Sequence, residues 1–266
     1  NPITTAVNNV LLGRNINGDT SNDFHGQIDE VKFYSRLLSD DEIISAYNLE
    51  YQTDELAYYK LDGDANDDYG YFHGTATSVQ FQTDAERGTV AKFGGSGSYI
   101  ALDKLSSNSA ITTLEGTVSG WFKATSESIL FFAGESNSNG YGGDNDLHVH
   151  VSSDGKLNGS INGTESFTVS STSTVFDGEW HYMVFTWEEN AINLLLDGEL
   201  NEVSFEADFD YSLNNFYLGR MGDYTRAFDG YLDDVKVYNY AVDLEGLSND
   251  YNQLIAQYKL DGNAND

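Results

Sequence analysis

The sequence repeats itself with a period of about 200 residues, and this repeat limits the fold more than any single motif. Residues 24–34 (FHGQIDEVKFY) return at residues 228–238 (FDGYLDDVKVY), 204 residues further along the chain. Residues 59–67 (YKLDGDAND) return at residues 258–266 (YKLDGNAND), 199 residues further along. A period of this length is that of a whole domain, whereas a solenoid repeat has roughly 20–50 residues.

We therefore predict a window from a tandem array. In this division, residues 1–52 are the C-terminal part of one repeat, residues 56–255 a complete repeat, and residues 256–266 the first strand of the next. The alternative is a single domain with two similar edge strands. The chain begins with Asn1 and not with Met, so we also expect that a leader or an upstream region precedes it.

The composition is that of a folded, strongly anionic protein without cysteine. Acidic side chains number 43 and basic ones 13, which gives a formal net charge of -30, while hydrophobic residues make up 39%. The lack of cysteine excludes disulfides, thiol nucleophiles and thiolate zinc sites. Scarce Lys and Arg disfavour nucleic acid as a partner, because phosphate binding depends on clustered cations. Membrane insertion is not expected, because no apolar run approaches the roughly 20 residues that span a bilayer.

Period-two alternation between turn signals predicts an antiparallel all-β fold. Residues 118–123 and 147–152 alternate apolar with polar side chains. The strongest hairpin signal is residues 192–205, in which Asp197-Gly198 supplies the two positive-φ positions of a type I′ turn.

Helix is scarce in the sequence. Residues 39–42 (SDDE) read as a capping box that opens a short helix ending near Tyr47, and Asp243 caps its later counterpart. We therefore expect one or two short helices beside the strands.

Several segments resemble, in order, the laminin-G-like domains of the concanavalin-A-like jelly-roll superfamily. These segments are residues 59–67 (YKLDGDAND), 118–122 (VSGWF), 180–182 (WHY), 196–198 (LDG) and 230–238 (GYLDDVKVY). The resemblance implies a two-sheet antiparallel jelly-roll sandwich whose first and last strands are adjacent, with a calcium ion in many members. It does not identify the ligand, because the same sandwich serves lectins, adhesion receptors, carbohydrate-binding modules and glycosidases.

One loop has the residue types of a calcium site. Residues 62–68 (DGDANDD) place side-chain oxygens at alternate positions of a turn, and Ca²⁺ takes oxygen ligands at about 2.3–2.6 Å. In the resembling jelly rolls, a structural calcium often ties the two ends of the domain together. The predicted ligands are Asp62, Asp64, Asn66, Asp67 and Asp233. The alternative is a turn with solvated acids.

A second possible metal site lies at Asp144 and Asp146, in a stretch rich in Gly and Asn. Its alternative is a flexible loop with incidental acids. His148 and His150 share one strand face, but no third ligand with a defined spacing accompanies them. We therefore interpret these histidines as a solvent-facing pair.

The sequence gives little support for catalysis. A retaining glycosidase needs two carboxyl groups about 5–5.5 Å apart. The nearest pattern is residues 206–210 (EADFD), but it has Tyr211 where the related glycosidases carry a glutamate. No nucleophile elbow, P-loop or dinucleotide fingerprint occurs. We assign His181, beside Trp180, to core packing, and we predict a protein that is not an enzyme.

Sugar recognition commonly combines an aromatic face with convergent Asn and Asp side chains. Two loops, which we expect at one end of the sandwich, supply these residue types. The predicted ligand-binding residues are Asn137, Tyr141, Asp144, Asn145, Tyr224 and Arg226. The alternative for the tyrosines is that they only fill strand faces and loops.

These observations predict a non-catalytic, extracellular, calcium-binding laminin-G-like module of a multi-repeat surface or secreted protein. Its expected partners are a glycan or glycoprotein, bound for adhesion or substrate anchoring, and the neighbouring repeats. Repetition favours binding, because weak sites that act together gain effective concentration. Two alternatives stay open, namely a structural repeat of an extracellular filament or stalk that binds only calcium, and a glycosidase of the same fold.

Overall fold

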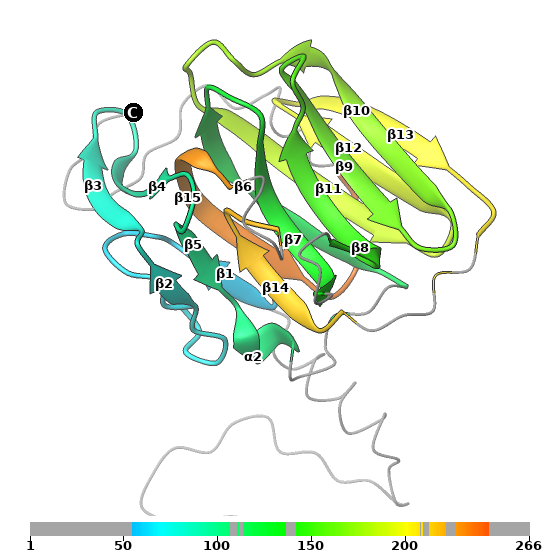
Figure 1. The fold of residues 1–266 in the computed structure, drawn as a ribbon, viewed down its shortest axis with the longest axis horizontal. Helices are drawn as coiled ribbons and strands as arrows, with labels where there is room; N and C mark the ends of the chain where they lie inside the picture. Colours follow the sequence, from blue (N-terminus) through cyan, green and yellow to red (C-terminus); the bar gives the residue numbers. More distant parts are fainter. Residues whose placement is uncertain are drawn as a thin grey trace, which may run out of the picture. The chain divides into compact units, whose positions relative to one another are not determined.

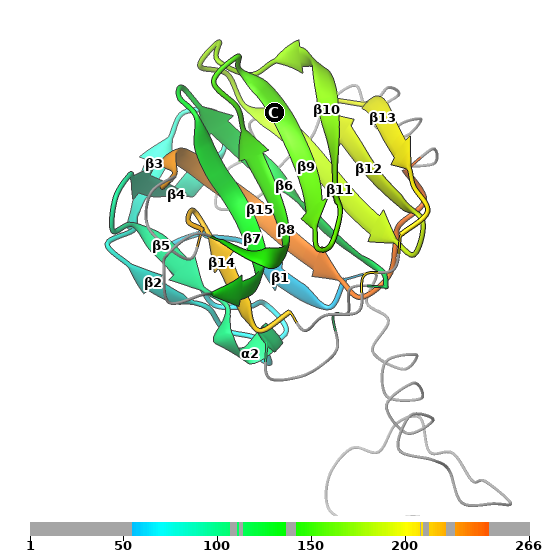
Figure 2. The same cartoon turned by 45° about the vertical axis from the view of Figure 1, so that its right-hand side comes forward.

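The computed structural model describes residues 55–106, 111, 114–136, 142–207, 209, 213–221 and 227–244. Fifteen strands of these residues form two antiparallel sheets, which lie face to face in Figures 1 and 2. The predicted all-β jelly-roll sandwich is therefore confirmed. The preceding and following repeats lie outside the described residues.

One sheet has eight strands. Its spatial order is β13 (Glu199–Ser204), β12 (Ala191–Leu196), β11 (His181–Glu188), β6 (Gly116–Ala124), β15 (Asp229–Tyr238), β4 (Gly88–Gly94) and β3 (Gln80–Asp84), and β1 (Ala57–Tyr59) pairs with β15. The other sheet has seven strands. Its order is β10 (Ser166–Thr174), β9 (Lys156–Asn162), β8 (Gly142–Val151), β7 (Ser128–Ser136), β14 (Asn215–Leu218), β5 (Tyr99–Ala101) and β2 (Thr75–Thr77).

The hydrophobic core lies between the two sheets and follows the alternation of the strands. In β6, Val118 and Phe122 are fully buried, whereas Trp121 between them is half-buried and faces outward. In β11, Phe185 and Trp187 belong to the same core cluster. Aromatic side chains of this size dominate core energetics, because each removes about 150–250 Å² from water.

The first and last described strands of the domain are adjacent, as the resemblance implies. β1 pairs antiparallel with β15, with Tyr58 opposite Lys236 and Tyr59 opposite Val235. β15 itself lies between β6 and β4. The two ends of the domain thus meet in the middle of the eight-stranded sheet.

The predicted hairpin is confirmed. β12 pairs with β13, and Asp197 (φ 49°) and Gly198 (φ 82°) form the turn between them. Both residues lie in the left-handed region that a type I′ turn requires. Asp197 tolerates this conformation because its side chain accepts hydrogen bonds nearby, as described below.

One helix was not predicted, namely the short α2 (Asp103–Ser106), whose Leu105 is buried in the core. The capping box at residues 39–42 lies outside the described residues. Within the described part of the chain, no helix is long and apolar enough to cross a membrane.

Candidate ligand-binding face

The outer side of the seven-stranded sheet carries a row of polar side chains, of which Asp146, His148, Asn158 and Ser160 are buried. Leu147, Val149 and Val151 of β8 point into the core, so the alternate residues of β8 point outward. The same alternation applies to β9 and β10. We call this surface the polar face. Its members are Asp146, His148, His150, Asn158, Ser160, Asn162, Thr168 and Ser170, together with Tyr99 and Tyr217.

The strand register aligns these side chains across the sheet. Tyr217 of β14 is opposite Phe132 of β7, which is opposite His148 of β8. His148 is opposite Ser160 of β9, which is opposite Thr168 of β10. Side chains directly opposite each other on antiparallel strands lie about 4.5–5.5 Å apart. One row of aromatic and hydrogen-bonding groups therefore runs across five strands.

Hydrogen bonds order the polar half of this face. Asp146 Oδ1 lies 2.7 Å from His148 Nδ1 and accepts a hydrogen bond of 2.9 Å from Asn162 Nδ2. The hydroxyl of Ser170 donates to Asn158 Oδ1 at 2.6 Å. These contacts fix the side-chain rotamers before a ligand arrives, which lowers the entropic cost of binding.

The other half of the face is aromatic. The guanidinium carbon of Arg220 lies 4.2 Å from the ring centroid of Tyr99 and 4.3 Å from that of Tyr217. Tyr217 also stacks on the fully buried Phe132, at a centroid separation of 6.4 Å. Tyr99 and Tyr217 stay partly exposed, so they present ring surface beside the polar row.

The polar face is almost uncharged, although the chain has a net charge of -30. Among the described side chains of the seven strands, Asp146 is the only carboxylate and Lys156 the only cation. The available hydrogen-bonding groups are hydroxyls, amides and imidazoles. Such groups both donate and accept hydrogen bonds, as sugar hydroxyls do.

None of the predicted ligand-binding residues is among the described members of this face, because Asn145 has the inward direction of Leu147. Asn145 lies in β8 and is half-buried, and Asp144 precedes it in the same strand, although its side chain is outside the described part. Asn137, Tyr141, Tyr224 and Arg226 also lie outside the described residues. The sequence interpretation missed the row from Tyr217 to Thr168. The sequence did contain a signal for this row, because Asn158 and Ser160 alternate with apolar residues or Gly in residues 157–161. We used that alternation only to predict a strand.

The strands from which the two predicted loops depart run antiparallel. In the register of β7 and β14, Asn215 is opposite Gly134 and Leu218 is opposite Phe131. The chain therefore leaves the C-terminal end of β7 and the C-terminal end of β14 at opposite ends of this strand pair. We expected both loops at one end of the sandwich. In this register they start at opposite ends of the β7–β14 pair.

Asp67 and Asp64, two of the ligands predicted for the first calcium site, accept hydrogen bonds from different protein groups. Asp67 is 2% exposed, and its carboxylate accepts backbone hydrogen bonds from Tyr58, Tyr71 and Phe72 at 2.9–3.1 Å. Asp64 accepts hydrogen bonds from the backbone and side-chain amides of Asn66 at 2.8 and 2.6 Å. Asp67 therefore holds the loop against β1 and the segment at residues 71–72.

Asp233 is bound by a protein cation. It is fully buried, and its carboxylate accepts a hydrogen bond of 2.7 Å from Arg87 Nε. Arg87 Nη2 donates to Asp234 at 2.8 Å, and Asp234 also accepts a hydrogen bond from Tyr58. The register of β15 shifts between Asp233 and Lys236, so two successive carboxylates reach the same guanidinium.

The structure therefore does not assemble the predicted cage. Within the described ranges, no three Asp, Glu or His side chains form a group that could hold a metal ion. Asp146, of the second possible site, is buried and contacts His148 and Asn162. The side chain of Asp144, the other residue of that site, lies outside the described part. Calcium at either site stays a prediction.

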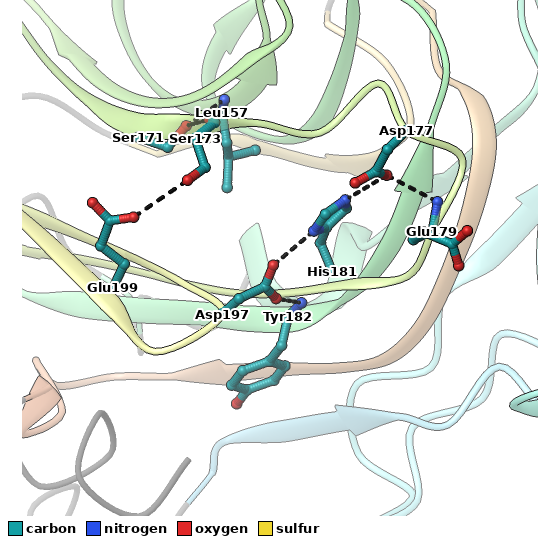
Figure 3. A network of polar contacts seen from close by, with 9 residues as sticks. All are labelled: Leu157, Ser171, Ser173, Asp177, Glu179, His181, Tyr182, Asp197 and Glu199. Carbon is teal, nitrogen blue, oxygen red and sulfur yellow. Dashed lines mark hydrogen bonds and ion pairs between the residues drawn. The ribbon is translucent and has the colours of Figure 1, made fainter. Parts of the chain in front are cut away.

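His181 belongs to a polar network as well as to the core, as Figure 3 shows. Its Nδ1 lies 2.7 Å from Asp197 Oδ2 and its Nε2 lies 3.0 Å from Asp177 Oδ1. Asp197 also accepts a hydrogen bond of 2.8 Å from the backbone amide of Tyr182. Burial alone lowers the pKa of His181, but the hydrogen bonds to Asp197 and Asp177 outweigh this effect and raise the pKa above 6.5. The imidazole thus connects the turn before β11 with the turn between β12 and β13.

An acidic cleft lies beside the turn between β11 and β12 and the C-terminal end of β13. It has a volume of about 910 Å³ and is lined by Glu188, Glu189 and Glu206 together with Phe205. All three glutamates are exposed. A general acid normally needs an apolar environment that raises the pKa of its carboxyl group. Asp208 and Asp210 of the acidic pattern lie outside the described residues.

Solved structures with the same fold include several binding domains. Domain 4 of AbnA, a GH43 extracellular arabinanase from Geobacillus stearothermophilus solved with arabinotriose, is 19% identical, with a TM-score of 0.58 and coverage of 75% of this chain and 98% of that one. The binding domain of botulinum neurotoxin serotype G is 12% identical, with a TM-score of 0.58, and the match covers 74% of this chain and 50% of the toxin chain.

A third similar structure is a carbohydrate-binding module. The CBM40 of the Ruminococcus gnavus IT-sialidase, solved with α2,3-sialyllactose, is 16% identical, with a TM-score of 0.52 and coverage of 61% and 96%. These likenesses establish the fold alone, because all identities are low. No curated protein matches the chain significantly. A family profile described as the Concanavalin A-like lectin/glucanases superfamily matches residues 93–246. The chain therefore belongs to the concanavalin A-like lectin/glucanase superfamily.

Proposed function

We propose that this domain is a non-catalytic carbohydrate-binding module whose sugar site is the polar face. The observation that carries the proposal is the row from Tyr217 through His148 and Ser160 to Thr168, which places an aromatic ring beside aligned hydrogen-bonding groups. Sugars offer the matching chemistry, because they have apolar C–H patches between hydroxyls.

The proposed roles follow from position. The partly exposed rings of Tyr217 and Tyr99 provide stacking surface, and the guanidinium of Arg220 contacts both rings. Asn162 and Asn158 provide amides that already hold a partner on one side. A sugar on this face would meet the partly exposed Tyr99 and Tyr217 on one side and the exposed Thr168 and Ser170 on the other. His148 and Ser160 between them are buried.

The carboxylates of the described residues argue for binding without hydrolysis. The polar face presents Asp146 without a second described carboxylate, whereas a glycosidase needs a pair. The acidic cleft lies elsewhere and its glutamates are exposed. Several similar structures are also binding domains by description, such as that of botulinum neurotoxin serotype G.

We also propose a cellular location and a parent protein for the domain. We place the domain outside the cell, as a module of a multi-repeat surface or secreted protein that uses glycan or glycoprotein binding for adhesion or substrate anchoring. Domain 4 of an extracellular arabinanase supports this setting by its fold. Calcium remains part of the proposal as an ion of the loop at residues 62–67, with no role in sugar contact.

A glycan array followed by calorimetry tests the proposal. The 266-residue chain is screened on neutral and acidic oligosaccharides that include arabinotriose and α2,3-sialyllactose. Replacing Tyr217 by Ala should weaken binding of the best ligand at least about fivefold, because stacking on one aromatic ring contributes about 1 kcal/mol. The matched control is Tyr231→Ala, which removes a partly exposed ring from the outer face of the other sheet.

Two results would contradict the proposed sugar site. One is an array without any binding by the native chain. The other is an equal loss of affinity in the Tyr217 and Tyr231 variants, which would place the sugar site away from the polar face. New reducing ends after incubation with a bound oligosaccharide would contradict the non-catalytic assignment.

A further inference from the structure

Two histidines lie side by side on the outer side of β8. His148 and His150 are two residues apart in the strand, so their side chains point to the same side of the sheet. Their ring centroids are 5.0 Å apart and their planes are tilted by 44°, so the rings do not stack face to face. His148 is 7% exposed and His150 is half-buried. The sheet therefore holds both imidazoles, and the pair meets solvent at His150.

The separation of the rings is that of two imidazoles bound to one metal ion. A zinc–nitrogen bond is about 2.0–2.1 Å long, so the ion lies about 3.2 Å from the centroid of each ring. A nitrogen–metal–nitrogen angle of about 90–110° then puts the two centroids about 4.5–5.2 Å apart. The observed 5.0 Å falls within this interval. The strand already places the two rings at the distance of a chelate.

Asp146 fixes the tautomer of His148. Its Oδ1 lies 2.7 Å from His148 Nδ1 and also accepts a hydrogen bond from Asn162. A carboxylate only accepts hydrogen bonds, so Nδ1 carries the proton of this contact and Nε2 is the acceptor of the neutral ring. Histidines that bind metals almost always have such a partner, because it orients the ring and makes the free nitrogen more basic.

Nε2 of His148 keeps contact with solvent. Among the described residues no hydrogen bond reaches this nitrogen, and it is not one of the polar atoms that are fully buried without a partner. The residues opposite the two histidines on β9 are uncharged, since His148 is opposite Ser160 and His150 is opposite Asn158. These neighbours do not repel a cation.

We propose that His148 and His150 bind one divalent transition metal ion, with Asp146 as the carboxylate that positions His148. The two imidazoles supply two ligands. Water completes the coordination, because no third Asp, Glu or His of the described ranges joins the group. The site rests on the geometry of β8 and does not depend on sugar binding.

The two imidazole ligands decide which ions the site accepts. Imidazole suits zinc, copper and nickel, whereas calcium and magnesium take oxygen ligands. For a given set of ligands the affinity rises from Ni²⁺ to Cu²⁺ and is lower again for Zn²⁺. The net charge of -30 favours any dication, because it raises the local concentration of cations. Copper is therefore the strongest probe, and this site is separate from the calcium predicted for the loop at residues 62–67.

Copper titration of the untagged 266-residue chain at neutral pH tests the inference without any sugar. We expect one high-affinity equivalent whose electron paramagnetic resonance spectrum shows coupling to two imidazole nitrogens. His150→Gln should weaken this equivalent more than about 100-fold and abolish the two-nitrogen signal, because losing a ligand costs more than the about 10–100-fold for losing its supporting partner. Asp146→Asn keeps both ligands, so it should weaken binding about tenfold and retain the two-nitrogen signal at saturating copper. The matched control is His73→Gln, which removes a half-buried histidine outside the pair and should leave this equivalent unchanged.

Zinc binding to the native chain provides a second readout that needs no variant. In nuclear magnetic resonance spectra, the imidazole signals of His148 and His150 should shift together with the first equivalent of Zn²⁺, while those of His73 and His181 stay in place.

Three results would overturn the inference. They are the lack of a stoichiometric copper equivalent, a two-nitrogen signal that survives His150→Gln, and zinc shifts confined to other histidines. A glycan array without binding would contradict only the proposed function, and a failed metal titration would leave that function untouched.

Discussion

Replacing Arg87 by Met should destabilise the domain strongly, because it leaves a buried carboxylate without a cation. The side chain of Arg87 is 10% exposed, that of Asp233 0% and that of Asp234 12%. The guanidinium bonds both carboxylates at 2.7 and 2.8 Å and lies 4.3 Å from the ring centroid of Trp121. Removing one partner of such a buried pair typically costs about 3–5 kcal/mol. For a domain of this size the melting temperature should fall by about 6–20 °C.

Urea unfolding followed by tryptophan fluorescence measures this loss, because Trp121 and Trp180 both lie beside the guanidinium. Adding Asp233→Asn to Arg87→Met should restore part of the lost stability, since it removes the uncompensated charge. Lys60→Met is the matched control. It breaks an exposed ion pair with Asp68 and should cost less than about 1 kcal/mol. A loss below about 1 kcal/mol in Arg87→Met, or a double variant less stable than the single one, would refute the reasoning.

Three further predictions concern pH, packing and metal. The pKa of His181 is raised above 6.5, so its protonated form stabilises the folded domain. This stabilisation is complete below pH 6.5 and is lost as the pH rises through the raised pKa. The stability difference between the native chain and His181→Gln in urea should therefore shrink with rising pH, and a growing difference would contradict this sign. Gly159→Ala should cost about 1–3 kcal/mol by chemical denaturation, because its Cβ would lie 2.3 Å from the buried ring of Phe185, and a neutral result would show that the ring can move. Excess EDTA at low ionic strength should lower the melting temperature if the loop at residues 62–67 binds calcium, and an unchanged midpoint would contradict that prediction.

The strands and their turns could be predicted because their signals are local. The alternation in residues 147–152 recurs in β8, and Asp197-Gly198 forms the turn between β12 and β13. The adjacency of β1 and β15 was implied by the resemblance and is confirmed. Each of these features depends on neighbouring residues or on a motif that covers the whole domain. α2 was missed because one turn of helix has no periodicity to detect.

The candidate site could be predicted only in outline. Aromatic and amide residues were expected to form it, but on loops. The sheet face was overlooked because Ser160, Asn162 and Thr168 look like ordinary exposed strand residues in the sequence. Only the register shows that they align with His148 and Tyr217. The predicted calcium ligands illustrate the same limit. Asp67 accepts hydrogen bonds from backbone amides and Asp233 accepts one from Arg87, and the sequence does not show either contact.

The sequence by itself determined which side chains of each strand face inward, because the direction alternates with every residue and needs no distant partner. It also determined that the domain is acidic and free of cysteine. The tertiary structure decided which strands lie side by side, and therefore which outward side chains are neighbours and which charged residues form ion pairs. Arg87 and Asp233 are 146 residues apart in the chain, and nothing local brings them together. Strand order sets such contacts, and it results from burying both sheets in one core.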